Sequence, residues 1–184
     1  MLRVFKSYHT PLQNPLLHSS SISFSSRPGD LESKDDFYIL SSNLVVIESS
    51  LNNYNPSLFT KIKRDALPVW IRVNLANRIA NNAKIWGQIF SKFNSGTHNN
   101  QWAIVDYNKF WEMKEEKGDK DGWENVVWLV EQFFDRIYEE DVTRKYLVGQ
   151  GYFATYNFPY DEEIFKEGNY GEKNPHDARE DIFR

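Results

Sequence analysis

The sequence contains no cysteine. This absence excludes disulfide bonds, thiolate metal sites and a cysteine nucleophile within these residues. Histidine is scarce too, and its copies are too scattered for any pair to sit at ligand spacing on one helix. We therefore expect no metal and no cofactor. The histidines are His9, His18, His98 and His176.

Long apolar runs are also lacking. No stretch approaches the ~20 residues that a membrane-spanning helix needs, so we predict no transmembrane segment. Charge of one sign is not concentrated either: the formal net charge is -4 with both signs interspersed, which argues against a nucleic-acid-binding surface. The chain does have 40% hydrophobic and 16% aromatic residues over 184 positions, enough for the core of a single domain.

The first 29 residues contain Arg3, Lys6 and Arg27, many serines and no acidic residue. This composition is similar to that of a mitochondrial presequence. A secretory signal is not indicated, because MLRVFKSYHT has no uninterrupted apolar core and no small-residue cleavage site follows it. We predict that this chain carries no signal peptide.

Strand-like patterns occur at residues 21–26 and 36–48, and a hairpin turn is predicted within the second, at residues 41–43. The Arg-Pro-Gly-Asp sequence at residues 27–30 is typical of a turn, because proline presets φ and glycine accepts a left-handed backbone. The strands on either side of it should therefore be neighbours in a sheet.

Two further strands are predicted at residues 101–107 and 125–132. The charged segment between them, EMKEEKGDKDG, is predicted to be a solvated hairpin loop. A helix from residue 109 to 117 is the alternative, limited to a turn or two because the segment shows no apolar stripe.

One long amphipathic helix is predicted over residues 66–93, where apolar side chains recur at three- and four-residue steps. Asp65 is its expected cap, and Pro68 falls in the first turn, where a missing amide costs little. Strands that look antiparallel and a helix that covers them predict an α+β layered domain.

Residues 94–110, NSGTHNNQWAIVDYNKF, combine amides, hydroxyls and a glycine in a turn before a strand. Gly96 permits a close backbone approach or a positive φ. The stretch is either a polar turn made of common turn formers or part of a site, and spacing alone does not decide.

Several blocks of this sequence, taken in order, resemble the phospholipase B-like family, also called the laminin ancestor family. The resemblance covers nearly the whole chain, and MLRVFKSYH is similar to an internal segment of the family, which weakens the presequence interpretation. The blocks are SISFSSRPGDLESKDDFYILSSNLVVIESS, NLANRIANNAKIWGQIFSKF, NSGTHNNQWAIVDYNKF, GYFATYNFPYDEEIF and AREDIFR.

This resemblance implies an N-terminal-nucleophile hydrolase fold, an αββα sandwich of antiparallel sheets, made as a precursor that cleaves itself to expose a catalytic cysteine. It implies hydrolysis of ester or amide bonds, with a lipid or N-acyl substrate, in a lysosomal or extracellular protein. The freed α-amine, with a pKa of about 7.7 to 8.0, can act as base for the nucleophile beside it.

The resemblance carries three site residues onto this sequence. Ser50 matches the second threonine of the family's Glu-Thr-Thr triplet, with the hydroxyl kept and the methyl lost. Asn157 matches the family's active-site asparagine, whose NH2 can donate to an oxyanion. Arg179 matches the family arginine if a short insertion follows residues 174–175; without it, His176 takes that position. The alternatives are a polar strand end, a turn asparagine and a solvated arginine.

The family's cysteine, with a histidine and an aspartate near it, lies upstream of the matched segment. We therefore interpret residues 1–184 as one incomplete phospholipase B-like domain and expect this chain alone to be inactive. The alternatives are a non-catalytic lipid- or protein-binding remnant and one piece of a complex that a complementary chain completes.

Overall fold

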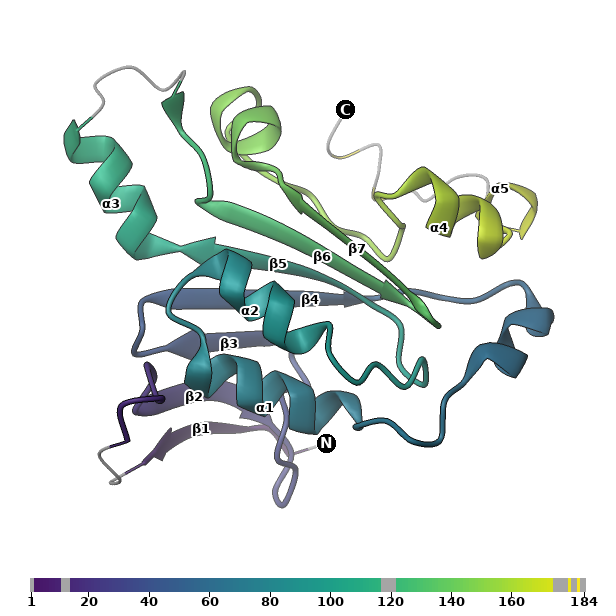
Figure 1. Ribbon diagram of the computed structural model, residues 1–184, viewed down its shortest axis with the longest axis horizontal. Helices are drawn as coiled ribbons and strands as arrows, with labels where there is room; N and C mark the ends of the chain where they lie inside the picture. Colours follow the sequence, from purple (N-terminus) through teal and green to yellow (C-terminus); the bar gives the residue numbers. More distant parts are fainter. Residues whose placement is uncertain (1, 11–13, 117–121, 174–178, 180–181, 183–184) are drawn as a thin grey trace.

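The computed structural model describes residues 2–10, 14–116, 122–173, 179 and 182 (Figure 1). Within them, seven strands form one sheet, each antiparallel to the next along the chain. The α+β class with antiparallel strands is confirmed. The strands are β1 Val4–His9, β2 Ser21–Ser26, β3 Phe37–Leu40, β4 Leu44–Ser50, β5 Asn100–Asp106, β6 Val127–Phe133 and β7 Arg136–Asp141.

Two helices, α1 Val69–Ile79 and α2 Ala83–Phe90, cover one face of the sheet (Figure 1). The other helices are spread around the later strands and the C-terminal segment. These others are the 3-10 helix η1 Pro56–Lys61, α3 Tyr107–Glu116, the π-helix η3 Thr143–Val148, α4 Glu162–Glu167 and α5 Tyr170–Lys173.

The predicted strands are present, and the turn at residues 41–43 joins β3 and β4, with Asn43 at φ 61°. The turn at residues 27–30 has Gly29 at φ 85°. Two strands were not predicted. β1 lies on the sheet edge and is largely exposed, and β7 is half-buried along its whole length, so neither shows a clear alternation of buried and exposed positions.

The prediction of one long helix over residues 66–93 is wrong, because the chain leaves the helix at Ala80, which has φ -71° and ψ 133°. Asn82 then begins α2, and its Oδ1 accepts a hydrogen bond from Ile85 N at 2.8 Å. Asp65 does not cap α1: Pro68 occupies that position, without a side-chain bond. Asparagine side chains favour caps over helix interiors because they compete for the backbone amides.

The predicted hairpin loop after β5 is also wrong where the structure describes it, because α3 extends over ten residues. Asp106 accepts a hydrogen bond from Lys109 N at 3.0 Å and so satisfies one amide of the first turn. Phe110 and Met113, one helical turn apart, pack into an apolar cluster with Trp123. Residues 117–121 of the predicted loop lie outside the described residues.

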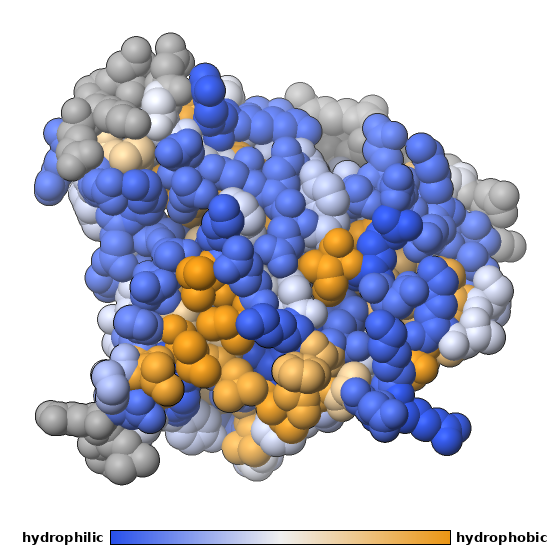
Figure 2. Space-filling model, viewed as in Figure 1, coloured by the Kyte–Doolittle hydropathy of each residue, from blue (hydrophilic) through white to orange (hydrophobic). Residues whose placement is uncertain are grey.

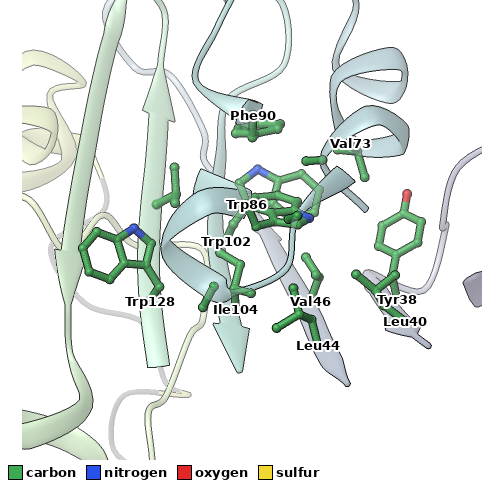
Figure 3. Close-up of a cluster of buried hydrophobic side chains, with 14 of the residues drawn as sticks. Tyr38, Leu40, Leu44, Val46, Val73, Trp86, Phe90, Trp102, Ile104 and Trp128 are labelled. Carbon is green, nitrogen blue, oxygen red and sulfur yellow. The ribbon is translucent and has the colours of Figure 1, made fainter. Parts of the chain in front are cut away.

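The main core lies between the sheet and the pair α1 and α2 (Figure 3). Trp86 of α2 is fully buried, and its ring centroid lies 5.1 Å from that of Phe90 and 5.3 Å from that of Trp102. Gly87 lets this helix approach the sheet, because a Cβ there would lie 2.9 Å from Val130 Cγ2. Figure 2 shows further apolar side chains gathered on the outer surface, over α1 and α2.

The second face of the sheet is covered unevenly. Phe110, η3 and the segment from Phe153 to Tyr160 pack over its later strands. Towards β1, large side chains stay in solvent: Phe5 is 64% exposed, Ile39 49% and Ile47 39%. Among the described residues, no helix is both long and apolar enough to cross a membrane.

Candidate functional site

The structure brings two of the predicted site residues together at the end of β4. Arg179 donates from Nη1 to Asn157 Oδ1 and from Nη2 to the Tyr156 carbonyl, both at 2.8 Å. Asn157 Nδ2 in turn donates to the Ser50 carbonyl at 2.8 Å. The guanidinium therefore fixes the orientation of the amide, whose NH2 faces the strand end. The alternative residue, His176, lies outside the described residues.

Asn157 also has an unusual backbone, with φ 68° in the left-handed region. Asparagine tolerates this region better than most residues. Its backbone amide donates to Ser49 Oγ at 2.9 Å, so both backbone and side chain are attached to β4. This attachment joins segments that lie more than 100 positions apart in the sequence, as the separation of 108 between Ser49 and Asn157 shows.

The hydroxyl of Ser50 points away from this pair. Side chains alternate along a strand, so Ser49 shares a face with Asn157 while Ser50 faces the side that carries α1. There Ser50 Oγ donates to Glu48 Oε1 at 3.0 Å and lies 3.4 Å from His98 Nε2. Ser50 therefore meets Asn157 through its carbonyl, which accepts the hydrogen bond from Nδ2. The sequence analysis did not single out Ser49. The alternation of side chains along a strand places Ser49 and Ser50 on opposite faces of the sheet, and this alternation was the available signal.

A buried carboxyl group anchors the segment that follows Asn157. Glu131 on β6 accepts bonds from Tyr160 N at 2.6 Å, Asp161 N at 2.8 Å and Gln101 Nε2 at 2.6 Å. Burial raises the pKa of Glu131, and these hydrogen bonds act in the opposite direction. Gln101 also donates to the Phe158 carbonyl at 3.1 Å. Neither Glu131 nor its role was predicted, since a lone glutamate in an apolar strand gives no signal of its partners.

The amide-rich stretch before β5 holds the turn after β6. Asn94 Nδ2 donates to the Phe134 carbonyl at 2.6 Å, and Asn99 Oδ1 accepts from Phe134 N at 2.8 Å. Gly96 has φ 73°, and a Cβ there would lie 3.0 Å from the Phe134 backbone. These contacts give the glycine and the amides a bracing role near the end of β4.

Metal ligands are not clustered in the part of the chain that the structure describes. There, no group of three or more histidine, cysteine, aspartate or glutamate side chains is placed so that it could hold an ion. The polar groups that meet at the end of β4 are amides, hydroxyls, a guanidinium and a carboxyl group.

The fold and site define an α+β protein with an antiparallel sheet, whose strand β4 ends at an arginine-supported asparagine. The Phospholipase B family model matches residues 1–176. The chain belongs to this phospholipase B-like family.

Three relatives illustrate the similarity. Phospholipase B-like protein G of Dictyostelium discoideum is 41% identical over 152 residues, covering 83% of this chain and 25% of that protein. Phospholipase B-like protein B of the same organism is 37% identical over 194 aligned positions, covering 100% and 32%. Phospholipase B-like 1 of Bos taurus is 36% identical over 170 residues, covering 92% and 30%. The chain thus spans between 25% and 32% of the length of these relatives.

Proposed function

We propose that this chain forms the oxyanion and substrate-holding part of a phospholipase B-like hydrolase, which cleaves ester or amide bonds of lipids. The observation that carries this proposal is the hydrogen-bonded series from Arg179 through Asn157 to the Ser50 carbonyl. These are the positions to which the family resemblance assigns active-site roles.

Asn157 supplies the chemistry in this proposal. Its NH2 group has two donor hydrogens, and the Ser50 carbonyl accepts one of them. We assign the other to the oxyanion that forms when an acyl group is attacked. A fixed donor of this kind is worth about 10²–10³ in kcat in other hydrolases. Arg179 holds the amide oxygen and so acts as a positioning residue, as does the Ser50 carbonyl.

The nucleophile in this proposal is a cysteine at a newly freed N-terminus, as the family resemblance implies. No cysteine occurs among the 184 residues, so we assign it to a different segment or chain. Residues 1–184 then form one incomplete domain. By the same resemblance, we propose a lysosomal or extracellular location.

The uncovered part of the second sheet face supports an αββα sandwich. Phe5, Ile39 and Ile47 lie on neighbouring or nearby strands of this face and are more than a third exposed. Exposed apolar patches on soluble proteins commonly mark an interface. We propose that a second sheet, which carries the nucleophile, packs here.

The same exposed side chains favour one alternative, a non-catalytic module that binds lipid or protein through this face. Vesicle binding by the chain separates the two functions. Binding that is lost on Ile39→Ser and Ile47→Ser, yet unaffected by Asn157→Asp, supports the alternative. An absence of vesicle binding removes its support.

Hydrolysis by the purified chain tests the proposal. With phosphatidylcholine vesicles and an N-acyl amide as substrates, we expect no turnover above that of the Asn157→Asp variant, because the nucleophile is supplied elsewhere. Turnover that the wild-type chain performs alone and that Asn157→Asp abolishes would contradict the proposal. Circular dichroism of both proteins confirms that the comparison is made between folded chains.

A further inference from the structure

An apolar cavity lies on the same face of the sheet as Asn157. Its volume is about 270 Å³, and side chains of β4, β5 and β6 form its floor. Phe110 of α3, Leu147 of η3 and Phe153 pack over these strands and form the opposite wall. No charged side chain lines the cavity within the described part of the chain. The cavity is therefore suited to an uncharged, apolar group.

A small residue near the centre of the floor creates this hollow. Ala103 of β5 is paired with Ile47 on β4 and with Leu129 on β6. Side chains of directly opposed residues lie on the same face of a sheet, so a methyl group stands here between two larger side chains. Alanine is depleted in strands, and a larger apolar residue at this position would fill the space. Ala103 thus keeps the floor of the cavity open.

The near end of the cavity adjoins the proposed oxyanion site. Ile47 lines the cavity and shares a face of β4 with Ser49, about 7 Å away because a strand rises ~3.3 Å per residue. Ser49 Oγ accepts the hydrogen bond from Asn157 N at 2.9 Å. Thr155, two positions before Asn157, also lines the cavity. A molecule whose carbonyl lies at Asn157 can therefore extend into this space.

The far end of the cavity lies at α3. The lining continues along β5 through Ala103 and Val105 to Tyr107, the first residue of that helix. These positions span about 13 Å at ~3.3 Å per residue. Tyr107 is 44% exposed, so this end reaches the solvent. The cavity is thus elongated along β5, which suits an extended chain better than a compact group.

We propose that this cavity holds the acyl chain of the substrate, with the carbonyl at Asn157 and the methyl end towards α3; the assignment rests on the function proposed above. The volume is nearly twice the ~150 Å³ of an engineered cavity that binds benzene, so it holds about ten carbon atoms. Ala103 then determines the length of chain that is buried. The second sheet is proposed to pack towards β1, whereas this cavity lies under a cover that the chain itself supplies.

Calorimetric titration of the full chain at pH 7.5 with saturated fatty acids, from butanoic to tetradecanoic acid, tests this assignment. A fatty acid is the product of the proposed reaction, so it carries the acyl chain and a charged head group. We expect the affinity to increase about fourfold with each CH2 group that becomes buried. The increase should stop at about ten carbon atoms, because a longer chain extends past Tyr107 into solvent.

Two substitutions that fill the cavity should move this limit. Ala103→Leu adds three carbon atoms to the floor, so the increase should stop about three carbon atoms earlier. Val105→Phe, at a half-buried position closer to α3, should also shorten the limit and keeps the test valid if Ala103→Leu fails to fold, which circular dichroism reveals. Ala66→Leu is the matched control, the same change at a half-buried position before α1, and should leave the limit unchanged.

Affinity that does not depend on chain length, or a limit that neither cavity substitution moves, would overturn the proposal. The space would then belong to side chains of another protein segment. Asn157→Asp tests the head group separately, because its negative charge should lower the affinity for every chain length by the same factor. A length limit that persists without this common decrease supports the acyl cavity and contradicts the oxyanion role of Asn157, so either idea can fail alone.

Discussion

Glu48 is held among buried neighbours on β4, where Ser50 and Asn100 donate hydrogen bonds to its Oε1. Burial raises its pKa from 4.5 to about 7, and the hydrogen bond from Asn100 acts in the opposite direction. The folded chain therefore holds a proton on this group over a pH range in which the unfolded chain releases it. Stability and pH are coupled through this residue.

We predict that the free energy of unfolding falls as pH rises from 4.5 to about 7, by up to about 3 kcal/mol from Glu48 alone. Glu48→Gln keeps the side-chain shape and removes the titration, so this variant should show a flatter curve. Urea unfolding of both proteins across this range measures the effect. Glu131 acts in the same direction and His98 in the opposite one, and both cancel in the difference between the two proteins.

Parallel pH curves for wild type and Glu48→Gln would contradict this account. Glu162→Gln is the matched control, because the Glu162 side chain is 87% exposed. This variant should give a curve parallel to that of the wild type.

At the scale of single residues, the resemblance named three candidate site residues, but it did not give the directions of their polar groups. Asn157 and Arg179 were predicted from the resemblance, and they contact each other. Ser50 was predicted for its hydroxyl, yet in the structure its carbonyl meets Asn157. The identity of a residue does not reveal which face of a strand it occupies until the register of the whole sheet is known.

At the scale of elements, the break between α1 and α2 determines how the helix layer covers the sheet. The apolar period continues through the break, so periodicity alone favoured a single helix. The decisive signal is local: Asn82 caps the next helix, and a cap is favoured over a helix interior for asparagine. The length of α3 was underestimated because its few apolar residues form no stripe in the sequence; Phe110 and Met113 pack into a cluster with residues beyond the helix, such as Trp123 and Val127.

We predict that Asn82→Ala destabilises the chain by about 1 kcal/mol, because Ile85 N loses its capping acceptor. Urea unfolding at fixed pH measures the change. Asn81→Ala is the matched control, since Asn81 receives a bond from Asn82 but caps no described helix. It should cost less than about 0.5 kcal/mol. Equal costs for the two variants would show that the cap is not what begins α2.

At the scale of the whole molecule, one sheet carries two chemically different faces. The helix-bearing face holds the main core and the buried Glu48 carboxyl, and the opposite face holds Asn157 and the exposed apolar side chains. Antiparallel strands were predicted, with short turns at residues 27–30 and 41–43 as the clearest signals, and the order of the strands in the sheet was not predicted. The uncovered face was not predicted, because exposure depends on what packs against a strand and not on the strand's own pattern.

The central claim is that this chain supplies the oxyanion side of a hydrolase whose cysteine nucleophile comes from elsewhere. Co-expression of the chain with the part of Bos taurus phospholipase B-like 1 that lies outside the region aligned with this chain, followed by an assay on phosphatidylcholine and an N-acyl amide, tests it most directly. We predict hydrolysis only with both chains, reduced about 10²–10³-fold by Asn157→Asp. Hydrolysis by this chain alone, or an active pair in which Asn157→Asp changes nothing, would contradict the account.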